Sequence, residues 1–193
     1  QSVNTSASLF KKTSGAKFAS DSLDDFFFTQ GGQTRLAGYQ FADAFSTYDP
    51  LVQRFVVADI YANALTPPGG TGNEILLAMS NSNDPTTFTA ADWNFFTLDT
   101  SEPGVTFQDY PGNIGYNADA LVITLNSFNG NNALHVLVNS ISISALKSGT
   151  PLAVGTNAFE TDYGGFSLRP TTMQDALPGG PMWFVQEGGD YKS

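Results

Sequence analysis

The sequence predicts an all-β fold assembled from short antiparallel strands. Its apolar residues fall in short runs rich in β-branched and aromatic side chains, and loops containing Gly, Pro, Asn and Asp separate these runs. No amphipathic stretch of about 12 residues or more shows the helical period. The chain has 193 residues, of which 41% are hydrophobic and sixteen are Phe, so it can form a packed core.

Each apolar run is bounded by residues that stop a strand. Asp49 and Pro50 precede the first run, and the segment PPGGTG at 67–72 precedes the second; Pro has no N–H to donate to a sheet. Gly and Asn within 128–133 favour a hairpin connection, because both tolerate positive φ. A short helical turn capped by Ser22 is expected at 22–28. The expected strands are 54–61, 74–80, 93–98, 120–126, 134–143 and 182–186.

The spacing of the runs favours consecutive four-stranded antiparallel blades of a β-propeller. Three runs lie within 48–100 and two or three more within 110–147. A repeat of roughly 40–50 residues is the size of one blade, so the chain is expected to hold about four. The approximate blades are 1–60, 61–108, 109–160 and 161–193. A single β-sandwich or jelly-roll domain is the alternative.

Composition excludes several classes of partner and chemistry. The net charge is −10, and no Lys or Arg occurs between Arg54 and Lys147, so nucleic acid and anionic lipid would be repelled. Cys is absent, which excludes disulfides, a thiol nucleophile and a thiolate zinc site. No apolar run approaches the roughly 20 residues of a membrane span.

The low content of charged residues, with many Ser, Thr, Asn and Gly, indicates an exported protein that is extracellular or on the cell surface. Charged residues make up 13% of the chain, about half the usual share. The start at Gln1 has neither a basic segment nor an apolar one, so a signal peptide is expected to have been removed already.

Several motifs occur in the order found in a family of secreted or cell-surface bacterial β-propeller proteins, mostly uncharacterised and distantly similar to sialidase-type propellers. The motifs are SLFKKTSG at 8–15, SLDDFF at 22–27, YDPLVQRFVV at 48–57, LAMSNSNDP at 77–85, DYPGNIGYNADALVI at 109–123, LRP at 168–170 and PGGPMWFV at 178–185. The chain thus resembles the N-terminal blades of that family. The resemblance implies blade architecture and an exported location, and it carries over no catalytic residues.

The motif at 109–123 contains a candidate metal site. Asp109, Asn117 and Asp119 flank the start of an expected strand, and their oxygen atoms suit Ca²⁺, which takes six to eight hard oxygen ligands. The alternative is a turn in which Asp and Asn side chains accept backbone N–H groups. The sequence favours the turn, so calcium is a second interpretation of these residues.

Aromatic residues offer a candidate ligand site. Trp93, Tyr110 and Tyr116, together with Tyr163 and Trp183, could stack on the apolar faces of sugars. The alternative, which is the usual place for aromatic residues in stacked sheets, is packing within the core.

Two further sets of polar residues are candidates for catalysis. Glu160 and Asp162 are one residue apart, so in a strand both would point to one face, as a pair of glycosidase carboxylates could. His135 is the single histidine, and a position on the surface or on a blade face is expected for it. No catalytic set emerges from these residues.

Three functions remain open at this point. The first is a non-enzymatic extracellular or cell-surface binding or assembly protein, associating with itself or with the remaining blades of a longer protein, with glycan as a further candidate partner. The second is a glycan-active enzyme of the propeller type, a glycoside hydrolase or lyase, which needs converging carboxylates in a pocket. The third is the structural subunit of a surface filament, in which strands pass between neighbours.

Overall fold

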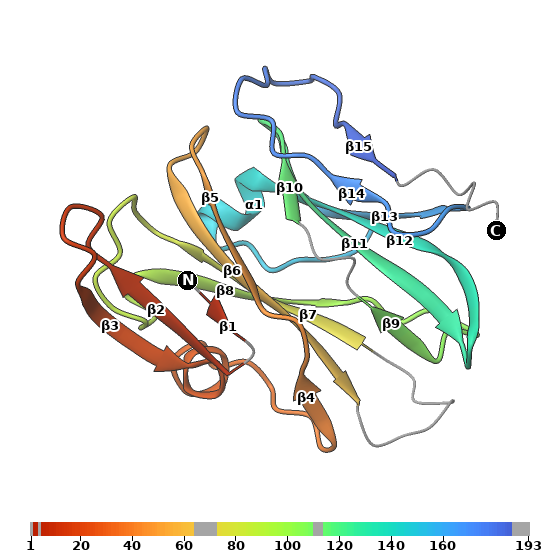
Figure 1. The fold of residues 1–193 in the computed structure, drawn as a ribbon, viewed down its shortest axis with the longest axis horizontal. Coiled ribbons are helices and arrows are strands. Elements are labelled where there is room, and N and C mark those ends of the chain that lie inside the picture. Colours follow the sequence, from red (N-terminus) through yellow and green to blue (C-terminus); the bar gives the residue numbers. More distant parts are fainter. Residues whose placement is uncertain (1, 4, 64–72, 110–113, 187–193) are drawn as a thin grey trace.

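The computed structural model describes residues 2–3, 5–63, 73–109 and 114–186, and Figure 1 shows its ribbon. The prediction of an all-β fold is confirmed, with 49% of the structure in strands and 8% in helices. All strand pairs within its sheets are antiparallel. No helix in the described residues is long and apolar enough to cross a membrane.

The strands form four sheets, which follow one another along the chain. Sheet A contains β1 (Ser2–Val3), β2 (Ser6–Phe10) and β3 (Lys17–Ser22). Sheet B contains β4 (Tyr39–Phe41), β5 (Phe45–Asp49), β6 (Arg54–Asn63), β7 (Asn73–Ser80) and β8 (Trp93–Asp99). Sheet C contains β9 (Phe107–Asp109), β10 (Ile114–Tyr116), β11 (Ala120–Asn129), β12 (Asn132–Ser142) and β13 (Ala158–Tyr163). Sheet D contains β14 (Arg169–Pro170) and β15 (Phe184–Val185).

Two short helical segments interrupt the strands, one between sheets A and B and one within sheet C. The π-helical turn η1 (Asp25–Gln30) follows sheet A, and Ser22 Oγ accepts the backbone N–H of Asp25 at 3.0 Å, in line with the turn expected there. The helix α1 (Ile143–Ser148) follows β12. It begins where Ser142 Oγ accepts the N–H of Ala145, and it ends at Gly149, whose φ of 70° favours glycine.

The sheets stack face to face, and the core lies in the three layers between them. Residues of β6, β7 and β8 pack against β10, β11 and β12 in the largest apolar cluster, between sheets B and C. The other face of sheet B packs against sheet A and η1, where Phe26 and Phe27 are buried. The other face of sheet C packs against Leu168, Met182 and Phe184, around sheet D. The two middle sheets are therefore covered on both faces.

Two-sided burial explains why β7 is a continuous apolar run rather than an alternating one. Ile75, Leu77 and Met79 point into the layer shared with sheet C, whereas Leu76 and Ala78 point into the layer shared with sheet A. Successive side chains of a strand point to opposite faces, so both faces of this strand must be apolar.

The sheets do not divide the chain where the repeat length suggests. The expected boundary after residue 60 falls inside β6, and the one after residue 160 falls inside β13. That prediction rests on blades of roughly 40–50 residues. Strand pairing instead places only 21 residues in sheet A, whereas sheet B spans residues 39–99. Within the described residues the sheets do not close into a ring.

The expected strands at 54–61, 74–80, 93–98 and 120–126 lie within β6, β7, β8 and β11. The run 134–143 corresponds to β12, except that its last residue begins α1. Of the expected strand 182–186, only residues 184–185 form β15. The hairpin expected at 128–133 joins β11 and β12, with Gly130 at a φ of 58°.

Replacing a buried leucine on either face of β7 should destabilise the protein by a similar amount. Leu76 and Leu77 are both fully buried, so we expect each Leu→Ala change to lower the free energy of unfolding by about 2–5 kcal/mol. Urea denaturation measures this, with the exposed Thr161→Ala on β13 as a control that changes it by less than about 0.5 kcal/mol. A loss confined to Leu77→Ala would show that sheet A does not cover sheet B.

Candidate functional site

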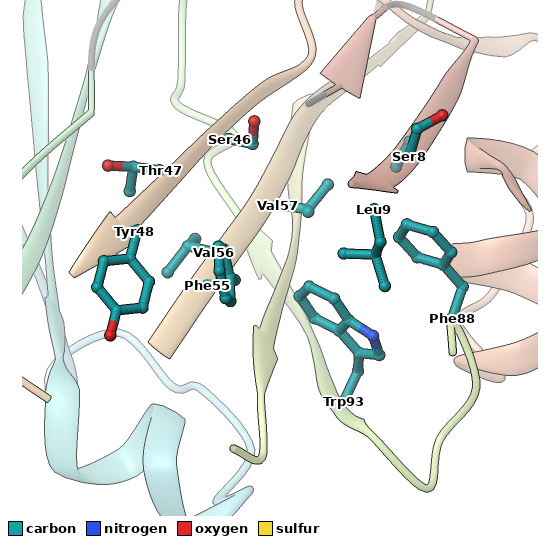
Figure 2. Close-up of a pocket in the computed structure, with 11 residues that line it drawn as sticks. Ser8, Leu9, Ser46, Thr47, Tyr48, Phe55, Val56, Val57, Phe88 and Trp93 are labelled. Atoms are coloured by element: carbon teal, nitrogen blue, oxygen red, sulfur yellow. The ribbon is translucent and has the colours of Figure 1, made fainter. Parts of the chain in front are cut away.

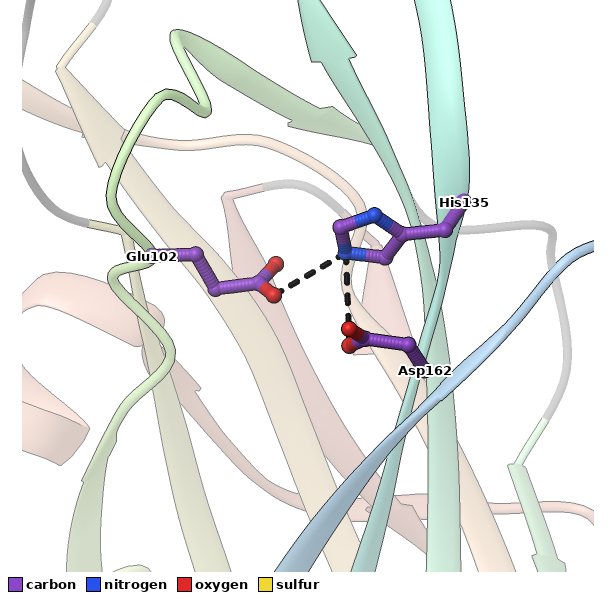
Figure 3. A group of neighbouring side chains, drawn as sticks. All are labelled: Glu102, His135 and Asp162. Carbon is purple, nitrogen blue, oxygen red and sulfur yellow. Dashed lines mark hydrogen bonds and ion pairs between the residues drawn. The ribbon is translucent and has the colours of Figure 1, made fainter.

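A polar cluster lies where the loop after β8 meets β12 and β13, and Figure 3 shows its three central side chains. His135 Nε2 is 2.9 Å from Glu102 Oε1 and 3.5 Å from Asp162 Oδ1. The side chains of Glu102 and His135 are largely buried, at 16% and 21% exposed, whereas Asp162 is 65% exposed. One ligand atom from each of the three residues lies within 4.8 Å of the others. The cluster therefore has the composition and spacing of a metal-binding site.

The orientation of the Glu102 carboxylate is fixed by two donors on sheet C. Its Oε2 accepts Ser127 Oγ at 2.9 Å and Gln108 Nε2 at 3.0 Å. Ser127 is directly opposite His135 in the β11–β12 pair, and the register shift after Ser127 ends this regular part of the hairpin. With Oε2 held in this way, Oε1 is the oxygen presented to His135.

Gln108 is itself held by surrounding polar groups. It is 2% exposed, its Oε1 accepts Thr100 Oγ1 and Asn73 Nδ2, and its Nε2 also donates to the Thr100 carbonyl. A buried amide with this many partners has one favourable orientation, so it acts as a rigid support for Glu102.

A further carboxylate lies beside the cluster. Glu160 precedes Asp162 by two residues on β13, so both point to the same face, as predicted. Burial raises the pKa of Glu160, and the negative charges of Glu102, Asp99 and Asp162 raise it further. The shift indicates that negative charge is concentrated here without enough compensating positive charge.

Two buried oxygens next to the cluster have no hydrogen-bond partner. Asn139 on β12 is fully buried and directly opposite Glu160, and neither Asn139 Oδ1 nor Glu160 Oε1 is hydrogen-bonded. Asn139 lies four residues after His135 on the same strand and therefore on the same face. His135 Nε2 contacts the carboxylates of Glu102 and Asp162.

Sequence analysis identified His135, Glu160 and Asp162 but did not connect them, and it missed Glu102. Glu102 lies in a loop, 33 residues before His135, and no local pattern marks it. The expectation of a surface or sheet-face position for His135 holds only in part, because its side chain points into the layer between sheets rather than to solvent.

The structure does not bring the three residues of the proposed calcium site together. Asp109 is paired with Asn126 on β11, whereas Asn117 and Asp119 directly precede the first residue of that strand, Ala120. At about 3.3 Å per residue, six residues of strand separate them by roughly 20 Å. A single ion cannot contact all three.

Asn117 and Asp119 instead hold the turn between β10 and β11. Asn117 Oδ1 accepts the backbone N–H groups of Asp119 and Ala120, each at 2.9 Å, and the residue is 6% exposed. Asp119 Oδ2 accepts the N–H of Gly179 at 2.6 Å, which ties the turn to the loop that joins β14 and β15 of sheet D. These contacts fit the turn interpretation.

Of the proposed aromatic platform, Trp93 and Tyr116 do not share one surface. Trp93 and Tyr116 are each 2% exposed, and they belong to different apolar layers, one on each side of sheet B. Burial of their apolar rings explains both positions. Tyr110 lies outside the described residues.

Trp93 does line a small cavity between β2 and β5, which Figure 2 shows. The cavity has a volume of about 210 Å³ and a mainly apolar wall that includes Leu9, Val57 and Phe88. The indole N–H donates to the carbonyl of Thr87 at 2.7 Å, so its polar atom is already paired. The cavity offers space for a small apolar group rather than a sugar.

Two other aspartates are buried away from the cluster. Asp49 and Asp59 are both fully buried, and each accepts a backbone N–H, from Leu51 and from Ala42 respectively. Burial raises the pKa of Asp49, and it raises that of Asp59 to about 8. Because each side chain closes a bend of the chain beside β5, a structural role explains both.

Comparison with known proteins gave no relative: no family model, curated protein or solved structure matches this chain. The candidate site therefore depends on its own geometry.

The pKa of Asp59 should make the protein less stable as the pH rises. The folded-state pKa of about 8 lies above the ordinary value of 3.8, so folding retains a proton that the unfolded chain releases between these values. We expect the free energy of unfolding to fall from about pH 4 to about pH 8, and Asp59→Asn to reduce the fall. Denaturant titrations at several pH values measure it, with the exposed Asp175→Asn as the control. Equal pH dependence in wild type and Asp59→Asn would contradict the prediction.

Replacing Asn117 should test the turn interpretation against the calcium one. Asn117→Ala leaves two backbone N–H groups without their acceptor, so we expect a loss of about 1–3 kcal/mol in unfolding free energy. The exposed Gln174→Ala is the control. A melting temperature that rises on adding Ca²⁺ in wild type but not in Asn117→Ala would instead support an ion at this turn.

Proposed function

We propose that the chain is a non-enzymatic assembly module of an extracellular or cell-surface protein, built from consecutive blades of a β-propeller. Sheets B and C are meanders of consecutive antiparallel strands, and each packs face to face on the next sheet of the chain. The strands β5, β10 and β14 lie next to one another at one edge of the stack, as innermost blade strands would. These features support the propeller assignment.

The observation that carries the assembly function is the apolar outer face of sheet D. Phe184 packs against sheet C, so its neighbours Trp183 and Val185 point away from the stack. Trp183 is 63% exposed and Val185 60% exposed, and Arg169, which is paired with Val185, is also exposed. Exposed apolar faces of this kind mark interaction surfaces. The preceding sheets are covered on such faces by another sheet.

The opposite end of the stack, at sheet A, carries serine pairs together with two partly exposed phenylalanines, Phe10 at 45% and Phe18 at 42%. On the outer face of sheet A, Ser6 is paired with Ser22 and Ser8 with Ser20, and the hydroxyl groups of Ser8 and Ser20 are 3.0 Å apart. A head-to-tail filament would have to bury these serine pairs against the apolar face of sheet D. A second copy with its own sheet D is the better match, and it gives a closed two-fold dimer.

The glycan-active alternative has less support. A glycosidase brings two carboxylates together in a cavity. None of three cavities in the described residues brings two carboxylates together. The cavity beside Trp93 is lined by no carboxylate, the cavity beside α1 by Asp119 alone, and the groove beside Phe10 and Phe18 by Asp84 alone.

Removing the apolar side chains of sheet D should dissociate the dimer into monomers. We expect wild type to have twice the 20.6 kDa mass of the chain in light scattering, and the double variant Trp183→Ser/Val185→Ser to have the monomer mass. Val154→Ser is the matched control, because Val154 is 50% exposed but lies outside sheet D. A monomeric wild type, or a dimer that persists in the double variant, would contradict the proposal; a mass that grows with concentration would favour a filament.

A further inference from the structure

We propose that Glu102, His135 and Asp162 bind one divalent transition-metal ion of the zinc class, at the end of the layer between sheets B and C. The ligand atoms are Glu102 Oε1, His135 Nε2 and Asp162 Oδ1. This site is independent of the assembly through sheet D, since none of its residues lies on that sheet.

The spacing of the three atoms suits a small ion. Zinc bonds of about 2.0–2.2 Å in tetrahedral geometry place neighbouring ligand atoms about 3.3–3.6 Å apart. The two distances from His135 Nε2 are 2.9 and 3.5 Å, and all three atoms are within 4.8 Å of one another. Asp162 is exposed and free to rotate, so a small change of its side chain completes the arrangement.

The site has the supporting contacts that metal ligands need. Ser127 and Gln108 hold the second oxygen of Glu102, which leaves the first oxygen directed at His135. Such outer contacts orient ligating carboxylates and raise metal affinity.

The unpartnered oxygens of Asn139 and Glu160 are an independent sign of a missing donor. Both are buried beside the cluster on the faces that carry His135 and Asp162, and buried oxygens are normally hydrogen-bonded. A water molecule bound to the metal would complete its coordination. Such a water is a strong hydrogen-bond donor, and Glu160, two residues from Asp162 on the same face of β13, offers an unpartnered oxygen to it.

Charge and ligand type both favour a transition metal over calcium. Asp99, Glu102, Glu160 and Asp162 interact at this end of the layer, and the 54–147 segment supplies no Lys or Arg between its two ends. A dication would offset this negative charge. One imidazole nitrogen with two carboxylates suits zinc and its neighbours, whereas calcium prefers oxygen ligands alone.

Calorimetric titration of chelator-treated protein with ZnCl₂ and with CaCl₂ tests the proposal. We expect one Zn²⁺ per chain, weaker or absent Ca²⁺ binding, and at least a tenfold loss of zinc affinity in both His135→Gln and Asp162→Asn. Asp175→Asn is the matched control, since Asp175 is exposed and outside the cluster, and it should bind as wild type does. Circular dichroism checks that each variant is folded. If His135→Gln does not fold, Asp162→Asn tests the proposal by itself.

Cobalt(II) provides a second readout that does not depend on stability. Its visible absorption should appear on binding to wild type and to Asp175→Asn, and should be lost in His135→Gln, because that change removes the nitrogen ligand. Absence of saturable zinc binding, or equal affinity in wild type and Asp162→Asn, overturns the proposal.

Discussion

The fold depends on the burial of sheets B and C on both faces. The strands β6, β7, β11 and β12 carry apolar side chains in both directions, and a sheet of this kind is stable only with a layer on each side. Sheet A with η1 supplies one outer layer, and sheet D with the segment around Leu168 supplies the other. The smaller sheets at the two ends are therefore required by the apolar content of the middle ones.

The scarcity of positive charge decides how the buried polar groups are satisfied. The chain has 18 acidic residues and 8 Lys or Arg, so most carboxylates cannot form an ion pair. Asp49 and Asp59 use backbone N–H groups and burial keeps their pKa values high. At the Glu102 cluster backbone donors are lacking, and a histidine, a serine and a glutamine take their place. This cluster is where an added cation would contribute most.

The two ends of the stack differ in chemistry although both are outer sheets. Sheet A turns serine pairs outward and leaves Phe10 and Phe18 partly exposed, whereas sheet D turns Trp183 and Val185 outward. The proposed association through sheet D and the proposed metal site between sheets B and C are separate properties. The first depends on the last strand of the described chain, and the second on the register of β12 with β13.

The sequence by itself determined the all-β class, the main strands of sheets B and C, and the hairpin between β11 and β12. These features depend on local residue patterns, namely two-sided apolar runs and a Gly-Asn turn. The expected strands did not include β2 and β3, because these short strands, SASLF and KFASDS, are rich in small and polar residues and contain no β-branched apolar run. Only the tertiary structure decided which polar residues meet. The loop after β8 brings Glu102 to His135, pairing of β12 with β13 brings Asp162 there, and a strand's length keeps Asp109 away from Asn117. Pairing between segments distant in the chain sets both outcomes, and no local pattern encodes it.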